Sequence, residues 1–401
     1  MIMRARTGAS LGVSAAFGLL HATAAQAREE FSLDVAGGVS AATNPFLSGG
    51  RDLDAGSGYV EVTPLLMTMN EISTVSLRGY ARFEQYSRLY GSDDAAGLDL
   101  NVTRMMSDRL KLRGGASLQT NRSSAQDLLT GRALSLEPAA GFSPVLNDVS
   151  FIGRRTRTFS VAARVGGSYS LGATDSVDAD FSAGLYRYKD PTLDDYRTAN
   201  QEFGYSHLLS ERTWLQASIG FGEIDYLDQR AGDATIVSPL VGFARELSET
   251  LRVSASAGLS LSRVRRPDGS HSSGAGLALR GSICDDQMRG KICLELDRSS
   301  QPTALGDVTT LTSLAATASR RLSRRDELLL NANFSRTAGS AGLFTSRQTY
   351  VGGSVGLDHQ LNQRLVLFGS SSYSDIYDRR IPRRANLQAR VGIRYHFGAL
   401  R

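Results

Sequence analysis

The sequence is poor in cysteine, tryptophan, lysine and long apolar runs. Its 401 residues contain two cysteines and one tryptophan, and lysine occurs only at positions 111, 189 and 291. No segment after residue 27 approaches the ~20 apolar residues that a transmembrane helix requires, which excludes a helical membrane protein. The net charge is only +5 and is dispersed along the chain, so nucleic acid is not an expected partner.

Motifs of catalysis and cofactor binding are also missing. No metal-ligand spacing, phosphate loop or dinucleotide fingerprint occurs. After residue 27 the only histidines are at positions 207, 271, 359 and 396. Asp358 and His359 are adjacent, so in a strand their side chains would point to opposite faces. A hydrolytic site needs a nucleophile, a base and an orienting group within hydrogen-bond reach. We therefore expect no enzyme activity and no cofactor or metal.

Residues 1–27 have the pattern of a cleaved signal peptide. Arg4 and Arg6 form a positive start, residues 11–20 form a short apolar core, and Ala-Gln-Ala at 25–27 is a small-residue cleavage site. The apolar core is too short for the alternative, a membrane-anchoring helix. We expect residues 28–401 to form the mature, exported protein.

Alternation of apolar and polar residues is the main signal in the mature chain. In residues 385–397 (ANLQARVGIRYHF), every odd position is apolar and every even position is polar or glycine. Successive side chains of a strand point to opposite faces, so this segment has one apolar and one polar face. It is longer than the ~9–11 residues that a tilted strand needs to cross a bilayer. Residues 75–83, 110–118, 177–185 and 251–261 alternate in the same way.

Counting such segments predicts eighteen strands, with sixteen as the alternative. Their ranges are 30–42, 57–69, 72–86, 96–105, 109–120, 157–170, 174–188, 197–208, 212–224, 233–246, 250–264, 273–284, 291–299, 308–321, 326–337, 348–360, 364–376 and 385–397. An even number places both chain ends at the periplasmic rim of an outer-membrane barrel. Five similar short turns then share that rim, at 106–110, 209–213, 247–251, 322–326 and 361–365.

The predicted fold of residues 28–401 is an all-β, up-and-down transmembrane barrel in the bacterial outer membrane. An open sheet edge cannot persist in lipid, so the last strand must pair with the first, residues 30–42. The alternative is a soluble sandwich or propeller, which would show shorter strands with more proline and glycine between them.

Cys284 and Cys293 are predicted to form a disulfide. If the apolar faces of the two strands around this turn meet, Ile283 lies opposite Leu294 and Cys284 lies opposite Cys293. The sulfur atoms then share the other face, within bonding reach. A lone cysteine pair in an oxidising compartment usually bridges. Metal binding or catalysis by two thiols alone is the less favoured alternative.

The polar strand faces are expected to line the lumen. A lumen of mixed charge suits a hydrated polysaccharide or small polar solutes, and about eighteen strands leave room for an aqueous channel. The alternative is that the charges pair across strands and only stiffen the wall. The candidate polymer contacts are Arg78, Arg82, Arg113, Arg164, Arg252, Arg390 and Arg394.

The connection at 121–156 is the longest in the predicted barrel. Long connections in compact structures are usually functional or disordered. Two interpretations remain open for it, an inward constriction or lid and a flexible outer loop.

Three stretches resemble the β-barrel porin 2 family of outer-membrane proteins. They are residues 38–47 (GVSAATNPFL), residues 60–65 (VEVTPL), and residues 298–306 (RSSQPTALG) with the hairpins around Ser323 and Phe334. The resemblance extends over the mature chain as a pattern. Members of this family resemble the outer-membrane partners of exopolysaccharide export systems. The resemblance thus implies an exit channel or scaffold for a polysaccharide substrate, working with a periplasmic polysaccharide export protein.

Three functions follow from these features. Exopolysaccharide export rests on the family resemblance, and a general diffusion porin for small polar solutes rests on the polar lumen alone. An adhesin or assembly scaffold would have a filled lumen. Outer-membrane lipid, lipopolysaccharide and the barrel-assembly machinery are expected partners of any such barrel.

Overall fold

The computed structural model describes residues 28–122, 155–227, 232–266, 268–305, 307–340, 348–378 and 383–398. The predicted signal peptide and nearly all of the 121–156 connection lie outside these residues. The strands are β1 (Arg28–Ala42), β2 (Ala55–Met69), β3 (Ser73–Tyr86), β4 (Ser92–Met105), β5 (Leu110–Arg122), β6 (Arg157–Ser170), β7 (Asp175–Tyr188), β8 (Tyr196–Ser210), β9 (Thr213–Tyr226), β10 (Ala234–Glu246), β11 (Leu251–Arg265), β12 (His271–Gln287), β13 (Gly290–Thr303), β14 (Asp307–Arg321), β15 (Asp326–Ser340), β16 (Gln348–Gln360), β17 (Leu365–Asp378) and β18 (Asn386–Gly398).

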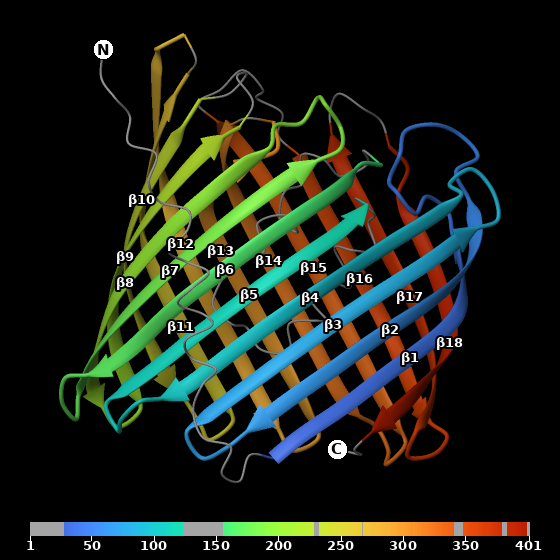
Figure 1. Ribbon diagram of the computed structural model, residues 1–401, viewed down its shortest axis with the longest axis horizontal. Coiled ribbons are helices and arrows are strands. Elements are labelled where there is room, and N and C mark those ends of the chain that lie inside the picture. The colour runs from blue at the N-terminus through green and yellow to red at the C-terminus, as the bar shows by residue number, and fades with distance from the viewer. Residues whose placement is uncertain are drawn as a thin grey trace.

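The strands form one closed antiparallel ring. Each strand pairs with its neighbours in sequence, and β1 also pairs with β18. The closing register runs from Ser32 opposite Gly398 to Ala42 opposite Gln388. Figure 1 shows β1 and β18 side by side at the right of the barrel. The predicted eighteen strands and the predicted pairing of the first strand with the last are both confirmed.

Most predicted strand boundaries agree with the structure within a few residues, and the largest differences are extensions. β4 begins at Ser92 rather than at 96, and β13 ends at Thr303 rather than at 299. In the added part of β4, Asp93 lies opposite Glu84 of β3. The backbone ladder continues past the apolar alternation because its hydrogen bonds require no apolar side chain. The sequence pattern marks only the part of each strand that faces lipid.

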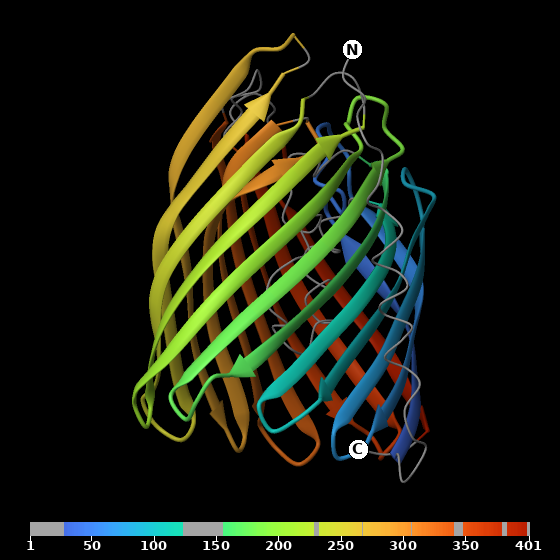
Figure 2. The ribbon, with the colours of Figure 1, turned by 60° about the vertical axis from the view of Figure 1, so that its left-hand side comes forward.

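Four of the five predicted short turns share one backbone geometry. The first residue's amide donates to the fifth residue's carbonyl at 2.8–2.9 Å. The second residue is serine or asparagine, and its side-chain oxygen accepts from the fifth amide at 3.0–3.1 Å. This contact explains why those residue types recur there. The turn at 209–213 is tighter than predicted, because Ser210 pairs directly with Thr213. Figure 2 shows the short turns together at one rim and the longer connections at the other.

The outward face of the barrel is apolar. Every strand carries at least one exposed large apolar side chain, and Val39 and Val241 are 60% and 61% exposed. A water-soluble protein does not expose a continuous apolar surface of this extent. Together with the closed ring, this surface identifies an integral outer-membrane β-barrel, and the soluble sandwich and propeller are excluded. No helix among the described residues is long and apolar enough to cross a membrane.

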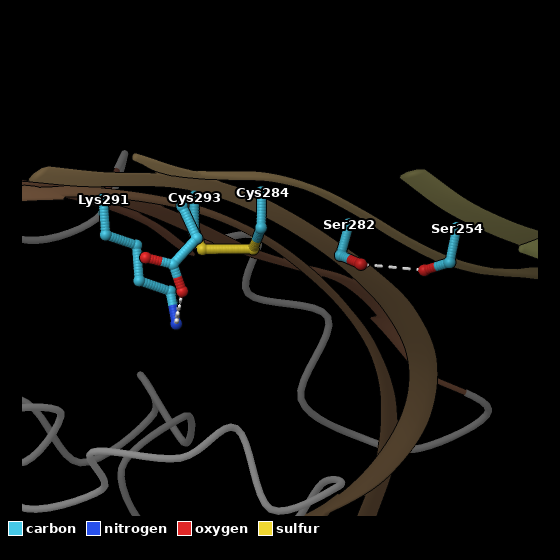
Figure 3. Close-up of a disulfide and its surroundings, with 6 residues drawn as sticks. Ser254, Ser282, Cys284, Lys291 and Cys293 are labelled. Carbon is cyan, nitrogen blue, oxygen red and sulfur yellow. Dashed lines mark hydrogen bonds and ion pairs between the residues drawn. A yellow bond between two sulfur atoms is a disulfide. The ribbon is translucent and has the colours of Figure 1, made fainter. Parts of the chain in front are cut away.

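The disulfide joins β12 and β13 near the periplasmic rim. Cys284 and Cys293 are bonded register partners with Cα atoms 4.1 Å apart. Ile283 and Leu294 are the next pair and are exposed on the outward face. The disulfide therefore lies on the inner face, and Figure 3 shows it on the same side of the wall as Ser282. The predicted bond and register are confirmed.

Candidate functional site

Strand alternation places all seven sequence-predicted arginines on the inner face of the barrel. In β18, Leu387, Val391 and Ile393 are exposed outward, so Arg390 and Arg394 point into the lumen. The other five arginines each lie an odd number of positions from an outward-facing residue of the same strand, so they also point inward. The outward residues are Phe83 for Arg78 and Arg82, Leu118 for Arg113, Val165 for Arg164, and Leu259 for Arg252. The contact of these arginines with a polymer stays a prediction.

The seven arginines do not gather into one site. Each has a polar partner on the lumen wall, which favours the interpretation that they stiffen the wall. Arg78 faces Asp99 in the β3–β4 register. The other pairs are Arg82 with Asp93, Arg113 with Asp180, Arg164 with Asn101, Arg252 with Glu246, Arg390 with Glu84 and Arg394 with Asp358.

Among the described residues, a solvent-accessible charged group on the lumen wall joins β5, β7, β8, β12 and β13. Arg113 Nε donates to Asp180 Oδ1 at 2.9 Å, and Arg280 Nη1 donates to Glu202 Oε1 at 3.2 Å. Arg280 Nε also lies 4.0 Å from an oxygen of Asp297. The Arg280 and Glu202 side chains are 54% and 41% exposed, so water reaches this part of the lumen. With Asp178, which lies 3.9 Å from Arg113, the acids outnumber the arginines by four to two.

A buried polar network occupies the inner wall at the closing seam. Glu84 of β3 is fully buried and accepts a hydrogen bond from Ser57 of β2. Arg390 of β18 lies 3.7 Å from Glu84 and 4.0 Å above the ring of Tyr59. A buried carboxylate requires such partners, because an isolated charge is costly away from water. The network therefore connects the last strand to the first hairpin from the inside.

The connection between β1 and β2, residues 43–54, is fastened at the outer mouth by Asn44. Its side-chain amide donates to the carbonyl oxygens of Ser48 at 3.0 Å and Arg384 at 2.9 Å. Its Oδ1 accepts from the Ser48 amide at 3.0 Å, and its backbone amide donates to Asn386 Oδ1 at 3.0 Å. The bonds tie this connection to the start of β18.

Apolar contacts also hold residues 43–54 in place at the outer mouth. Leu47 is fully buried in a cluster with Leu311, Tyr350 and Ile376, which belong to β14, β16 and β17. Phe46, its neighbour, is fully buried on the other side, against Tyr86 and Tyr90. Burial there raises the pKa of the Tyr90 phenol above its ordinary value. Residues 43–54 thus contact strands on both sides of the closing seam.

The tip of the β13–β14 hairpin also reaches inward. The Ala304 carbonyl accepts a hydrogen bond from the Asp194 amide at 2.7 Å, and Tyr226 donates through its hydroxyl to the Thr303 carbonyl at 3.3 Å. Ala304 is fully buried in a cluster that includes Tyr196 of β8. Residues 303–305 therefore meet strands that lie several positions away around the ring.

Sequence reasoning missed these two mouth segments. It assigned a candidate constriction to residues 121–156, of which only 121–122 and 155–156 are described. Within that remainder, Arg155 lies 4.9 Å from the centre of the Phe46 ring and donates to the Tyr90 carbonyl. The only sequence signal at 43–54 was Asn44-Pro45, which marks a turn but gives no direction for it.

Three of the four histidines among the described residues pair with an aspartate. His207, His359 and His396 each contact an aspartate of the neighbouring strand through Nδ1, at 2.7–2.8 Å. Within the described ranges, no group of three or more His, Cys, Asp or Glu side chains could hold a metal ion. The absence of enzyme activity stays a prediction.

Comparisons with known proteins do not assign the chain to a family. No family model matches the chain, so the resemblance to the β-barrel porin 2 family stays a prediction. No curated protein matches it either. Among solved structures, the chain is similar to the FrpB iron transporter of Neisseria meningitidis, with 8% identity, a TM-score of 0.48, and coverage of 92% of this chain and 81% of that one.

Two further structures show the same distant similarity. For OccK2 (OpdF) of Pseudomonas aeruginosa, the identity is 10%, the TM-score is 0.46, and 93% of this chain and 98% of that chain are covered. For OccAB4 of Acinetobacter baumannii, the identity is 7%, the TM-score is 0.43, and the same shares are covered. Similarities at this level carry no conclusion about substrate.

Proposed function

We propose that the protein is an outer-membrane channel for the passive diffusion of small polar solutes. The observation that supports it most directly is the charged group around Arg280 and Glu202. These side chains lie on the inner wall of an eighteen-stranded ring and are about half exposed to water. A ring of this size is wide enough for an aqueous passage.

The same group gives the channel a preference for cations. The carboxylates of Asp178, Asp180, Glu202 and Asp297 face the lumen with only Arg113 and Arg280 among them. A net negative charge on a water-filled wall raises the local concentration of cations and lowers that of anions. Neutral polar solutes would pass without this bias.

The mouth segments argue against the passage of a polymer. Residues 43–54 are held by the Asn44 hydrogen bonds and by buried Phe46 and Leu47, and residues 303–305 are held at Asp194 and Tyr226. A polysaccharide chain could leave only if these contacts opened. Exopolysaccharide export therefore rests on the family resemblance alone.

Planar-bilayer recording tests the proposal. Purified, folded protein should give a steady ion conductance, with a reversal potential that favours cations in a salt gradient. Vesicles that contain the protein should swell in small sugars and amino acids, and swelling should fall steeply as the solute grows. Folded protein that conducts no ions and admits no sugar would overturn the channel. Loss of surface polysaccharide on gene deletion, combined with a silent barrel, would favour export.

A further inference from the structure

A row of cationic side chains lies on the outward face at the outer rim. Arg122 ends β5 and Arg157 begins β6, and the two are register partners on the same face. Their neighbours Asn121 and Thr158 are buried and bonded to each other on the inner face, which fixes the arginines outward. Lys189 extends the row, because its amide donates to the Arg157 carbonyl.

The row carries more positive charge than its surroundings neutralise. Arg122 and Arg157 share one carboxylate, that of Asp94. Lys189 is exposed and forms no ion pair with the described residues. Like charges directly opposite each other on neighbouring strands destabilise a sheet unless an anion lies between them. The row therefore favours an additional anion.

A cavity opens beside this row. Its volume is about 600 Å³, and Arg122, Arg155, Arg157 and Lys189 line it together with Thr156, Asp190 and Pro191. Four cations and one acid thus face a space within the size range of small-molecule sites. Guanidinium groups bind phosphate through paired hydrogen bonds, so the chemistry of the lining matches a phosphate or several.

The apolar band begins directly beneath the row. Phe159, Val161 and Val165 follow Arg157 on the same outward face of β6 and are exposed. Arg187 of β7 lies opposite Phe159 and is also exposed. A ligand that fits both surfaces carries negative charge at one end and hydrocarbon at the other. A free polymer would use the cations and leave the apolar wall unused.

We propose that this cavity binds the phosphate-bearing headgroup of an outer-leaflet glycolipid. Arg122, Arg157 and Lys189 bind the phosphates, and the acyl chains lie along Phe159 and Val161. Arg122, Arg157 and Lys189 lie on the outward face of the barrel, whereas Arg155 lines the cavity from the side of the mouth, where it also contacts Phe46 and Tyr90.

Binding measurements on the purified barrel test this site. The probes are a glucosamine-disaccharide bisphosphate lipid, its enzymatically dephosphorylated form, and inorganic phosphate. Native mass spectrometry should show the bisphosphate lipid retained on the wild-type barrel and the dephosphorylated form retained at least tenfold less. The double variant R122Q/R157Q should lose at least tenfold in retention of the bisphosphate lipid. Arg109→Gln, at an exposed periplasmic turn, is the matched control and should behave as wild type.

A second variant removes a negative charge from the site. Asp94→Asn removes the shared carboxylate and should increase retention of the bisphosphate lipid. Heat-dependent gel mobility checks that the variant barrel is folded. Equal retention of the two lipid forms, or an unchanged R122Q/R157Q variant, would overturn the proposal. So would an acidic polysaccharide such as polygalacturonate that displaces the lipid and depends on the same arginines. Inorganic phosphate that binds as tightly as the lipid would show a plain anion site and would also overturn it.

Discussion

Arg280 of β12 reaches past three strands to Glu202 of β8, and the two side chains meet at 3.2 Å. The strands between them, β9 to β11, turn small residues such as Gly220, Ser238 and Ser256 toward the lumen. The two long side chains can therefore extend over these small residues and meet inside the lumen. In the proposed channel, a solute that follows this side of the lumen would meet the ion pair.

Removing the positive member of this pair should change ion selectivity. In Arg280→Gln, Glu202 and Asp297 lose their guanidinium partner, so the wall becomes more negative. We expect the cation-to-anion permeability ratio to rise by about twofold, since a unit charge in a watery site contributes a fraction of 1 kcal/mol. Reversal potentials in a potassium chloride gradient measure this ratio. An unchanged ratio would show that ions avoid the charged group.

The mouth segment should open when its polar fastening is removed. Asn44→Ala loses three side-chain hydrogen bonds to Ser48 and Arg384, each worth roughly 0.5–1.5 kcal/mol. We expect a larger and noisier single-channel conductance with little change in barrel melting, because the segment lies outside the sheet. Asn70→Ala is the matched control, since Asn70 accepts three hydrogen bonds in a turn at the opposite rim. Equal conductance in the two variants would contradict a constriction at residues 43–54.

The two faces of β11 should tolerate an introduced charge to different degrees. Ala255 is exposed outward, and its neighbour Ser256 points into the lumen. Ala255→Arg should cost roughly 2–4 kcal/mol at the bilayer midplane, and Ser256→Arg should cost much less. Denaturant titration of the barrel folded into lipid vesicles measures both. Similar costs at the two positions would count against the assigned faces.

The disulfide should contribute modestly to stability. Cys284 and Cys293 close a short loop whose hairpin is already joined by backbone pairing down to Gln287 and Gly290. Loop-closure entropy therefore gives an upper limit of about 3 kcal/mol. Melting of the C284S/C293S variant, compared with wild type with and without reductant, measures the difference. Complete loss of folding in the variant would show that the bond is needed during assembly.

The barrel could be predicted from sequence because each strand repeats the same local signal. Val391 and Ile393 alternate with Arg390 and Arg394, and this period of two fixes both the strand and the face of each side chain. The same logic fixed the register at Cys284 and Cys293, since a shift of one residue would move the apolar set into the lumen.

The mouth could not be predicted, because its structure depends on contacts between distant segments. Nothing near Leu47 indicates that it packs against Tyr350, which lies about three hundred residues away. The outward position of Arg122 and Arg157, by contrast, is encoded in the local sequence. Arg122 is in phase with Leu118, and Arg157 is in phase with Val161, so alternation alone places these charges on the lipid side. That they lie beside Lys189 could not be predicted, because this depends on the register of β5, β6 and β7.

The closing register has a consequence for the order of the chain. Ser32 and Gly398 face each other, so the two ends of the ring meet at one rim. The geometry of the ring therefore does not require the chain termini to lie between β1 and β18. A circular permutant should build the same wall with a linker of about six residues from 398 to 28 and new termini within the turn at 247–251. Its β1 and β18 would be joined early as a hairpin, and the last pairing to form would be that of β10 with β11.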